Sequence, residues 1–352
     1  MSTKKNPLRI GIIGLGRMGL MHAAIFNSLP NSTVVAAVDP SMFPAKPLGS
    51  LNPSIKIYKN ISKMFDKENI DGVVIASPVG YHVENANECI KRGVPFLMEK
   101  PLSLSAKDAL PLVDGLENTA LPNMIGYMAR NIDSFAKGKE ILDSGCLGNI
   151  QTVKGTVYVS QLFKKGKGWR YDPKIAGGGV LLSQGSHLID LLTWYFGSVA
   201  RVNSDILSVY SPGIEDFAHV MLNFESGLKG WIDASWSVRF KRKMELNIDI
   251  LGDNGSLIIT DDTLQLFLDN ENGGWPAGKS YFSANDLFTG VYVDIGGAKF
   301  TYQAQKFLNA IENNKTVEPD IKQGVHVQQV VDASYESASK MGEPVVINLL
   351  NI

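Results

Sequence analysis

The first third of the chain alternates short apolar runs with amphipathic segments. LRIGII, which begins at Leu8, has the length of a buried strand, RMGLMHAAIFNSL repeats apolar residues at helical spacing, and TVVAAV is again a short apolar run. Strand, helix and strand in this order predict a β-α-β unit. Further strand candidates cover 55–58, 72–76 and 95–98, and the helical pattern VENANECIKR stops before Gly93, a typical helix terminator. An open parallel sheet covered by helices is the expected packing.

The pattern changes after an apolar run at 124–128 and a helical segment at 132–144. Strand-like alternation then predominates, interrupted by one helical segment, Ser186–Phe196. The strand candidates are 152–161, 202–210, 218–224, 228–237, 246–252 and 256–260. The tail adds helical patterns at 302–313 and 325–340 and the apolar run VVINLL. We predict an α/β domain with a doubly wound parallel sheet over residues 1–125, and an α+β domain with a largely antiparallel sheet over residues 126–352.

Length and composition agree with two domains and exclude several functions. The 352 residues suffice for about two domains, and 44% hydrophobic with 20% charged residues is typical of globular chains. The net charge of -1 provides no general field for nucleic acid or an acidic membrane. No apolar stretch approaches the ~18 to 20 residues of a membrane helix. The only cysteines, Cys89 and Cys146, form no metal-binding pattern, so we expect a reduced, metal-free, cytoplasmic protein that begins with mature sequence.

A glycine-rich loop follows the first predicted strand directly and opens the first helix. Residues 14–19 read GLGRMG, which is the G-x-G-x-x-G pattern in the context that its mechanism requires. Gly14 allows a tight turn, Gly16 lets the backbone approach a pyrophosphate, and Gly19 permits close packing of helix on sheet. The helix N-terminus attracts the anion. We therefore predict a Rossmann dinucleotide site that includes Gly14, Gly16, Arg17, Met18 and Gly19.

The second strand ends in Asp39, about 20 residues beyond the glycine loop. A carboxylate at this point accepts hydrogen bonds from the hydroxyls of the adenosine ribose and repels the 2′-phosphate of NADP. NAD is therefore favoured over NADP as the cofactor. In the alternative interpretation, Asp39 is an ordinary turn residue before Pro40, and Arg17 reaches the 2′-phosphate of NADP.

Four segments together resemble one family. They are the glycine loop, SPVGYHVENA (77–86), MEKP (98–101) and WRYDPKIAGGGVLLSQGSHLIDLLTW (169–194). In combination they are similar to the glucose–fructose oxidoreductase / inositol dehydrogenase family, Gfo/Idh/MocA, over essentially the whole chain. The resemblance implies a Rossmann domain, a C-terminal α+β domain whose sheet forms a homodimer or homotetramer, and oxidation or reduction of a secondary hydroxyl of a sugar, cyclitol or sugar derivative.

The same resemblance implies roles for individual residues. It places Lys100 beside the nicotinamide and His187 opposite it, on a helix of the second domain, and assigns Ser77, Pro78, His82 and Glu99 to the cofactor side. Chemistry agrees with the two catalytic assignments. Hydride leaves carbon as the hydroxyl proton departs, so a base of near-neutral pKa such as His187 is suitable, while Lys100 can polarise the developing oxyanion.

One position departs from the family pattern. Many relatives have an aspartate four residues before the histidine, whereas this chain has Ser183. Three explanations stay open: Lys100 takes over proton transfer, Asp172 or Asp190 supplies the carboxylate, or the site no longer performs simple alcohol oxidation. The last would fit a non-catalytic NAD- and sugar-binding regulator, or a hydrolase or eliminase that retains NAD through a redox cycle.

A basic loop precedes the triple glycine. Lys164, Lys165, Lys167 and Arg170 lie in it, and Trp169 can stack on a sugar ring. The loop could bind a phosphate or carboxylate on the substrate, or it could be a solvated charge run. We expect Lys100, Trp169, Arg170, Ser183 and His187 to contact the substrate.

Overall fold

The computed structural model describes residues 6–41 and 54–348, without the side chains of residues 169 and 174, and divides the chain into two compact units. The first unit comprises residues 1–128 and 290–325, and the second comprises 129–289 and 326–352. The predicted domain boundary at residue 125 assigns segment 290–325 to the second domain, whereas the structure includes it in the first unit. That segment contains helix α10 (Ala298–Asn313), whose Ala304, Phe307 and Leu308 are buried in the core of the first unit.

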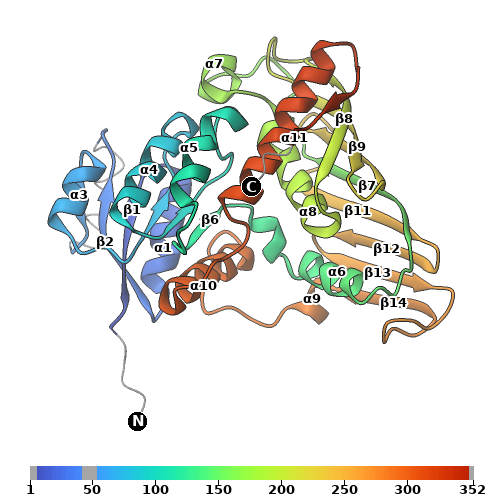
Figure 1. The fold of residues 1–352 in the computed structure, drawn as a ribbon, viewed down its shortest axis with the longest axis horizontal. Helices are drawn as coiled ribbons and strands as arrows, with labels where there is room; N and C mark the ends of the chain where they lie inside the picture. The colour runs from blue at the N-terminus through green and yellow to red at the C-terminus, as the bar shows by residue number, and fades with distance from the viewer. Residues whose placement is uncertain (1–5, 42–53, 349–352) are drawn as a thin grey trace. The chain divides into compact units, whose positions relative to one another are not determined.

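The first unit is a six-stranded parallel sheet, as the apolar runs predict (Figure 1). The strand order is β3-β2-β1-β4-β5-β6. The strands are β1 (Leu8–Ile13), β2 (Ser32–Val38), β3 (Lys56–Tyr58), β4 (Gly72–Ile75), β5 (Phe96–Met98) and β6 (Asn123–Ile125). The helices are α1 (Arg17–Ser28), α3 (Ile61–Lys67), α4 (His82–Arg92), α5 (Ala106–Leu116) and α10, with a 3-10 turn η1 (Val79–Tyr81).

Several residues of these elements explain their ends. Asn60 caps α3 by accepting the N–H of Lys63, and Ser105 caps α5 by accepting the N–H of Asp108. Helix α4 stops at Gly93, which adopts φ 65 in the left-handed region, as the sequence predicts. Residues 10–13 of β1 and all residues of β4 are buried and apolar, because helices cover both faces of a parallel sheet.

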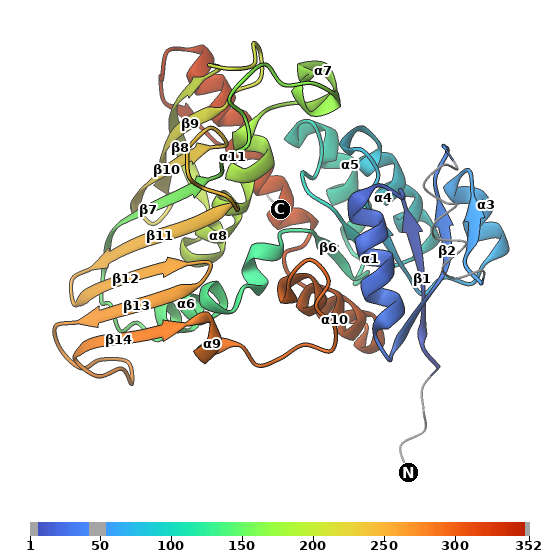
Figure 2. The same cartoon turned by 180° about the vertical axis from the view of Figure 1, so that it is seen from behind.

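The second unit is a nine-stranded, largely antiparallel sheet in the order β14-β13-β12-β11-β7-β10-β9-β8-β15 (Figure 2). Only β7 and β10 pair in parallel within it. The strands are β7 (Ile150–Tyr158), β8 (Val199–Leu207), β9 (Phe217–Phe224), β10 (Lys229–Ser235), β11 (Glu245–Gly252), β12 (Gly255–Thr260), β13 (Thr263–Leu268), β14 (Gly278–Ser283) and β15 (Val345–Val346). Strands β13 and β14 are absent from the sequence prediction, and β15 is the start of the predicted VVINLL strand, whose last two residues lie outside the described part.

Helices cover one face of this sheet. Helix α6 (Asp133–Asp143) packs on β12 and β13, helix α8 (Ser186–Phe196) packs on β7, and the short segment η4 (Leu181–Gly185) packs on β10. The unit also contains part of α11 (Ile321–Ser339) and the short segments η2 (Met128–Asn131), η3 (Trp169–Tyr171), α7 (Pro173–Ala176) and α9 (Ala284–Leu287). Leu188 of α8 lies so close to β7 that a Cβ at Gly155 would be 2.8 Å from its methyl groups. Alternation along β13, with Leu264, Leu266 and Leu268 buried, identifies the covered face.

Candidate functional site

In the first unit, the loops that follow β1, β4 and β5 lie at one edge of the sheet. The strands are parallel and adjacent in the order β1-β4-β5, so their carboxyl ends meet there. These ends lead into the glycine loop, into Ser77 and Pro78, and into Glu99 and Lys100. The structure thus brings together the residues that the sequence assigns to the cofactor.

The glycine loop has the space that a pyrophosphate needs. Gly14 adopts φ 90, and a Cβ at Gly19 would be 1.8 Å from the carbonyl oxygen of Gly14, so helix α1 touches the loop backbone. A Cβ at Gly16, in contrast, would meet no protein atom within 4 Å. Helix α1 begins at Arg17, and no side chain of the described residues caps it. The exposed N–H groups and the open side of Gly16 fit a bound phosphate group.

Asp39 is buried and holds the glycine loop. Its Oδ2 accepts the N–H of Leu15 at 2.9 Å, and its Oδ1 accepts the N–H and hydroxyl of Ser41 at 2.9 and 2.6 Å. Burial raises the pKa of Asp39, but these hydrogen bonds outweigh it and the pKa lies below the ordinary 3.8, so the group is a carboxylate. A carboxylate has about four acceptor positions, so about one remains on Oδ2 for a ribose hydroxyl.

His82 links the loop after β4 to the loop after β5. Its Nε2 lies 2.8 Å from the carbonyl oxygen of Ser77 and its Nδ1 lies 2.9 Å from that of Pro101. Burial lowers the pKa of His82, while both carbonyls and Glu99 act in the opposite direction. Asn85 donates to the Ser77 hydroxyl at 3.0 Å. The ring therefore holds the loops after β4 and β5 together within the first unit.

Glu99 has a partner that the sequence interpretation missed. His22 of α1 is completely buried, and its Nε2 lies 2.7 Å from Glu99 Oε1. The contact joins residues 77 positions apart, and nothing in the local sequence around His22 indicates it. Glu99 is thereby fixed next to Lys100, which is half-buried and joined to Pro101 by a cis peptide bond.

In the second unit, Ser183 and His187 lie on one helical run. The run starts at Val180, continues as the π-helical segment η4 and ends with α8 at Phe196. The two residues are four positions apart, and His187 is 3% exposed. Gly185 between them lies against β10, since a Cβ there would be 3.6 Å from the Cβ of Ala234.

Asp190, one of the carboxylates considered as a partner for His187, has a structural partner. Its Oδ2 and Oδ1 accept Nε and Nη2 of Arg130 at 2.9 and 2.7 Å, and both side chains are buried. The guanidinium also lies over the Trp194 ring at 5.4 Å. This bidentate pair attaches α8 to η2 and gives Asp190 a structural role.

The basic loop lies over an aromatic group at the carboxyl ends of β7 and β10. Gln161 donates to the Tyr171 hydroxyl at 3.2 Å, and the Tyr171 ring meets the edge of the Trp236 ring at 5.7 Å. Trp236 is fully buried, and no described residue accepts its Nε1–H. Arg170 is exposed on η3, whereas the side chain of Trp169 lies outside the described residues. Trp236 was missed because an indole in a strand-like run is usually core.

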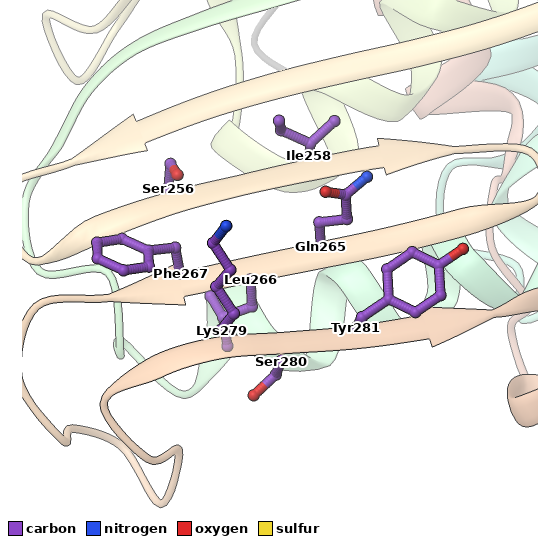
Figure 3. A pocket seen from close by; sticks show the side chains of 8 residues that line it. All are labelled: Ser256, Ile258, Gln265, Leu266, Phe267, Lys279, Ser280 and Tyr281. Carbon is purple, nitrogen blue, oxygen red and sulfur yellow. The ribbon is translucent and has the colours of Figure 1, made fainter.

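The uncovered face of the second sheet carries large apolar side chains. Trp231, Ile258, Phe267 and Tyr281 are 44%, 38%, 41% and 59% exposed. A shallow hollow on this face is lined by Ser256, Ile258, Gln265, Leu266, Phe267, Lys279, Ser280 and Tyr281 (Figure 3). Within residues 6–41 and 54–348, no three His, Cys, Asp or Glu side chains group as a metal site, and no helix is long and apolar enough to span a membrane.

Comparison with known proteins gives matches to both units. Residues 8–127 match the family model described as "Oxidoreductase family, NAD-binding Rossmann fold", and residues 135–258 match the "GFO/IDH/MocA C-terminal domain". Levoglucosan dehydrogenase of Pseudarthrobacter phenanthrenivorans is 23% identical over 95% of this chain and 96% of its own. Myo-inositol 2-dehydrogenase of Thermotoga maritima is 26% identical over 71% of this chain and 74% of its own.

A solved structure of levoglucosan dehydrogenase in complex with NADH has the same fold. The TM-score is 0.87, with 21% identity over 98% of this chain and 100% of the other.

Proposed function

This chain belongs to the GFO/IDH/MocA family of NAD-binding oxidoreductases, and we propose that it transfers hydride between NAD(H) and a secondary hydroxyl or ketone of a sugar, cyclitol or sugar derivative. The observation that carries the proposal is the common edge of β1, β4 and β5, where the open glycine loop follows β1 and Lys100 follows β5, on either side of β4. Relatives named as levoglucosan and inositol dehydrogenases support the substrate class.

In this mechanism the bound NAD supplies the hydride acceptor. His187 takes the proton of the substrate hydroxyl, because a neutral imidazole is a suitable base near pH 7. The Lys100 ammonium stabilises negative charge on the substrate oxygen. Ser183 hydrogen-bonds a second hydroxyl, and Trp236 Nε1–H, which lacks an acceptor among the described residues, donates to a third.

The proposal is tested with purified protein, NAD and a panel of polyols, inositols and sugar phosphates, followed by NADH absorbance. Lys100→Ala and His187→Ala should each lower turnover by orders of magnitude while NADH affinity changes little. Full activity of either variant on the true substrate refutes its catalytic role. If calorimetry detects no binding of NAD or NADH, the oxidoreductase proposal fails. Tightly retained cofactor without net NADH production would favour the NAD-retaining hydrolase or eliminase.

We propose NAD rather than NADP as the preferred cofactor. The support is Asp39, a buried carboxylate at the end of β2, next to which a 2′-phosphate would be repelled. Michaelis constants measured for both cofactors decide the question, and a lower constant for NADP refutes the preference.

We also propose that the basic loop selects an anionic substituent on the substrate. Ser160 forms an isolated β-bridge with Ser237, and the Ser160 hydroxyl accepts the N–H of Lys241. These contacts fix segment 236–243 beside the basic loop. Arg239 lies over the Phe163 ring at 4.7 Å. Lys164→Ala combined with Lys165→Ala should raise KM for sugar phosphates or uronates and leave KM for neutral polyols unchanged. An equal change for both substrate types refutes this selection.

The uncovered face of the second sheet is proposed to bind a second copy of the chain. Four large apolar side chains on one flat face support an interface between identical sheets. Light scattering after size exclusion should give a dimer or tetramer for the wild type and a smaller species for Phe267→Glu with Tyr281→Glu. Phe240→Glu, at a loop residue that is 96% exposed, is the matched control. A monomeric wild type refutes the proposed interface.

A further inference from the structure

The helical run that carries Ser183 and His187 starts at the triple glycine, and one glutamate binds its first N–H groups. Glu215 lies in the connection between β8 and β9. The N–H of Gly179 donates to its Oε2 at 2.8 Å, and the N–H of Leu181 donates to its Oε1 at 3.0 Å. The N–H of Val180 donates to its backbone carbonyl at 3.0 Å. Three consecutive N–H groups that a helix leaves without intrahelical partners therefore all bind Glu215.

Tyr335 of α11 is the second member of this arrangement. Its hydroxyl donates to Glu215 Oε1 at 2.8 Å. Burial raises the pKa of Tyr335, and the neighbouring Glu215 raises it further, so the phenol keeps its proton. Glu215 is only 4% exposed, and burial raises its pKa, while the Leu181 N–H and the Tyr335 hydroxyl act in the opposite direction. A carboxylate at this place also interacts favourably with the positive end of the helix dipole.

The glycines make room for this pair. A Cβ at Gly178 would be 2.1 Å from the Tyr335 hydroxyl oxygen, and a Cβ at Gly179 would be 2.1 Å from the carbonyl oxygen of Glu215. Neither distance is possible between non-bonded atoms, so any larger residue would displace Glu215 or Tyr335. The approach of Tyr335 and Glu215 from distant segments thus explains Gly178 and Gly179, while Gly177 adopts φ 75, in the left-handed region that favours glycine.

Residues 181–185, which lie between the helix start held by Glu215 and His187, have an unusual helical geometry that makes this anchoring important. Residues 181–185 are π-helical, a geometry that is rare and is found mainly as single turns at functional sites. Such a turn depends on outside contacts because its own hydrogen bonding is less favourable. Ser183 lies inside this segment and His187 follows it directly.

We propose that Glu215 and Tyr335 are positioning residues of the reaction, which fix the start of the helical run and thereby the placement of Ser183 and His187. This inference rests on the proposed function. Both residues belong to the second unit and neither is part of the glycine loop or of the loops after β4 and β5, so their role is predicted to concern the substrate step alone.

The test compares Glu215→Gln and Tyr335→Phe with the wild type and with Glu271→Gln, a control at an exposed glutamate. Glutamine keeps the shape of glutamate but places an NH₂ donor against groups that are themselves donors. Glu215→Gln should lower kcat about 100-fold, the effect of a displacement near 1 Å, and Tyr335→Phe about tenfold. The Kd for NADH should stay unchanged in both variants, and Glu271→Gln should behave as the wild type.

Hydrogen exchange provides a readout that is independent of activity. Amides of residues 179–188 should exchange faster in Glu215→Gln, while those of β11 and β12 keep their protection. Wild-type kcat and wild-type exchange in both variants overturn the inference. A parallel loss of NADH affinity also overturns it, since that marks general unfolding. If the wild type oxidises no polyol, the proposed function fails, and unchanged exchange at 179–188 would show separately that Glu215 does not hold the helix start.

Discussion

Replacing Asp190 by Asn is predicted to destabilise the second unit without abolishing the chemistry. The substitution keeps the shape of the side chain and removes its charge, so the buried Arg130 guanidinium loses the negative charge of Asp190. The side chains of Asp190 and Arg130 are 0% and 5% exposed, and two hydrogen bonds of 2.7 and 2.9 Å join them. Breaking a buried pair of this kind costs about 3 to 5 kcal/mol.

That cost is measurable as a shift in thermal unfolding. For a unit of this size, 1 kcal/mol corresponds to roughly 2–4 °C, so the midpoint should fall by roughly 6–20 °C. Calorimetry at pH 7 measures it. The double variant Arg130→Met with Asp190→Leu should lose less stability than Asp190→Asn, because no charge stays buried. Glu336→Gln, which breaks the exposed pair with Lys340, is the control and should leave the midpoint unchanged.

Activity distinguishes the structural role from a catalytic one. Below its lowered midpoint, Asp190→Asn should retain most of its turnover with NAD and polyol. A variant that unfolds at the wild-type temperature but has lost turnover would refute the reasoning and would make Asp190 the carboxylate that serves His187.

Three further predictions concern the first unit. Gly16→Ala should weaken NADH binding roughly tenfold or more, measured by calorimetry, with an unchanged melting temperature, whereas Gly19→Ala should lower the melting temperature because its Cβ would be 1.8 Å from a backbone oxygen. Asp39→Ala should raise kcat/KM for NADP relative to NAD, and an unchanged ratio would contradict the role of its charge. The pKa of Glu68 lies below its ordinary 4.5, mainly through the Tyr58 hydroxyl, so the stability from this contact is present above pH 4.5 and is lost as the pH falls through the lowered pKa. Tyr58→Phe should therefore reduce the melting temperature at pH 7. The difference in melting temperature between this variant and the wild type should become smaller as the pH falls. A difference that is the same at every pH would contradict this prediction.

The sequence predicts which segments form the strands of the two sheets better than it predicts which hydrophobic core each helix joins. Strands β1 and β4 follow from their apolar runs, because a strand buried on both faces needs no polar residue. The period-2 pattern of β13, with three buried leucines, is typical of a half-buried strand, whereas the edge strand β14 has only Tyr281 and Phe282 as large apolar residues. The amphipathic pattern of α10 predicts a helix, but nothing in that pattern says which core its apolar face joins.

The residues of the candidate site also differ in how well the sequence predicts them. The glycine loop is local, so spacing alone identifies it, and the structure provides the open side at Gly16. Partners far apart in sequence are invisible to spacing: His22 meets Glu99 across 77 positions, and Arg130 meets Asp190 across 60. The spacing places Asp190 three residues after His187, but it does not show that Asp190 pairs with Arg130.

The return of the chain to the first unit through α10 has a consequence for synthesis in the cell. The ribosome makes the six parallel strands first, yet Phe307 and Leu308 of their core emerge only after strands β7 to β14 of the second sheet. At translation rates of about 5–20 residues per second, the nascent strands wait roughly 10–40 s with an apolar surface uncovered. This interval is when a chaperone would be needed, and a truncated product ending before α10 should aggregate.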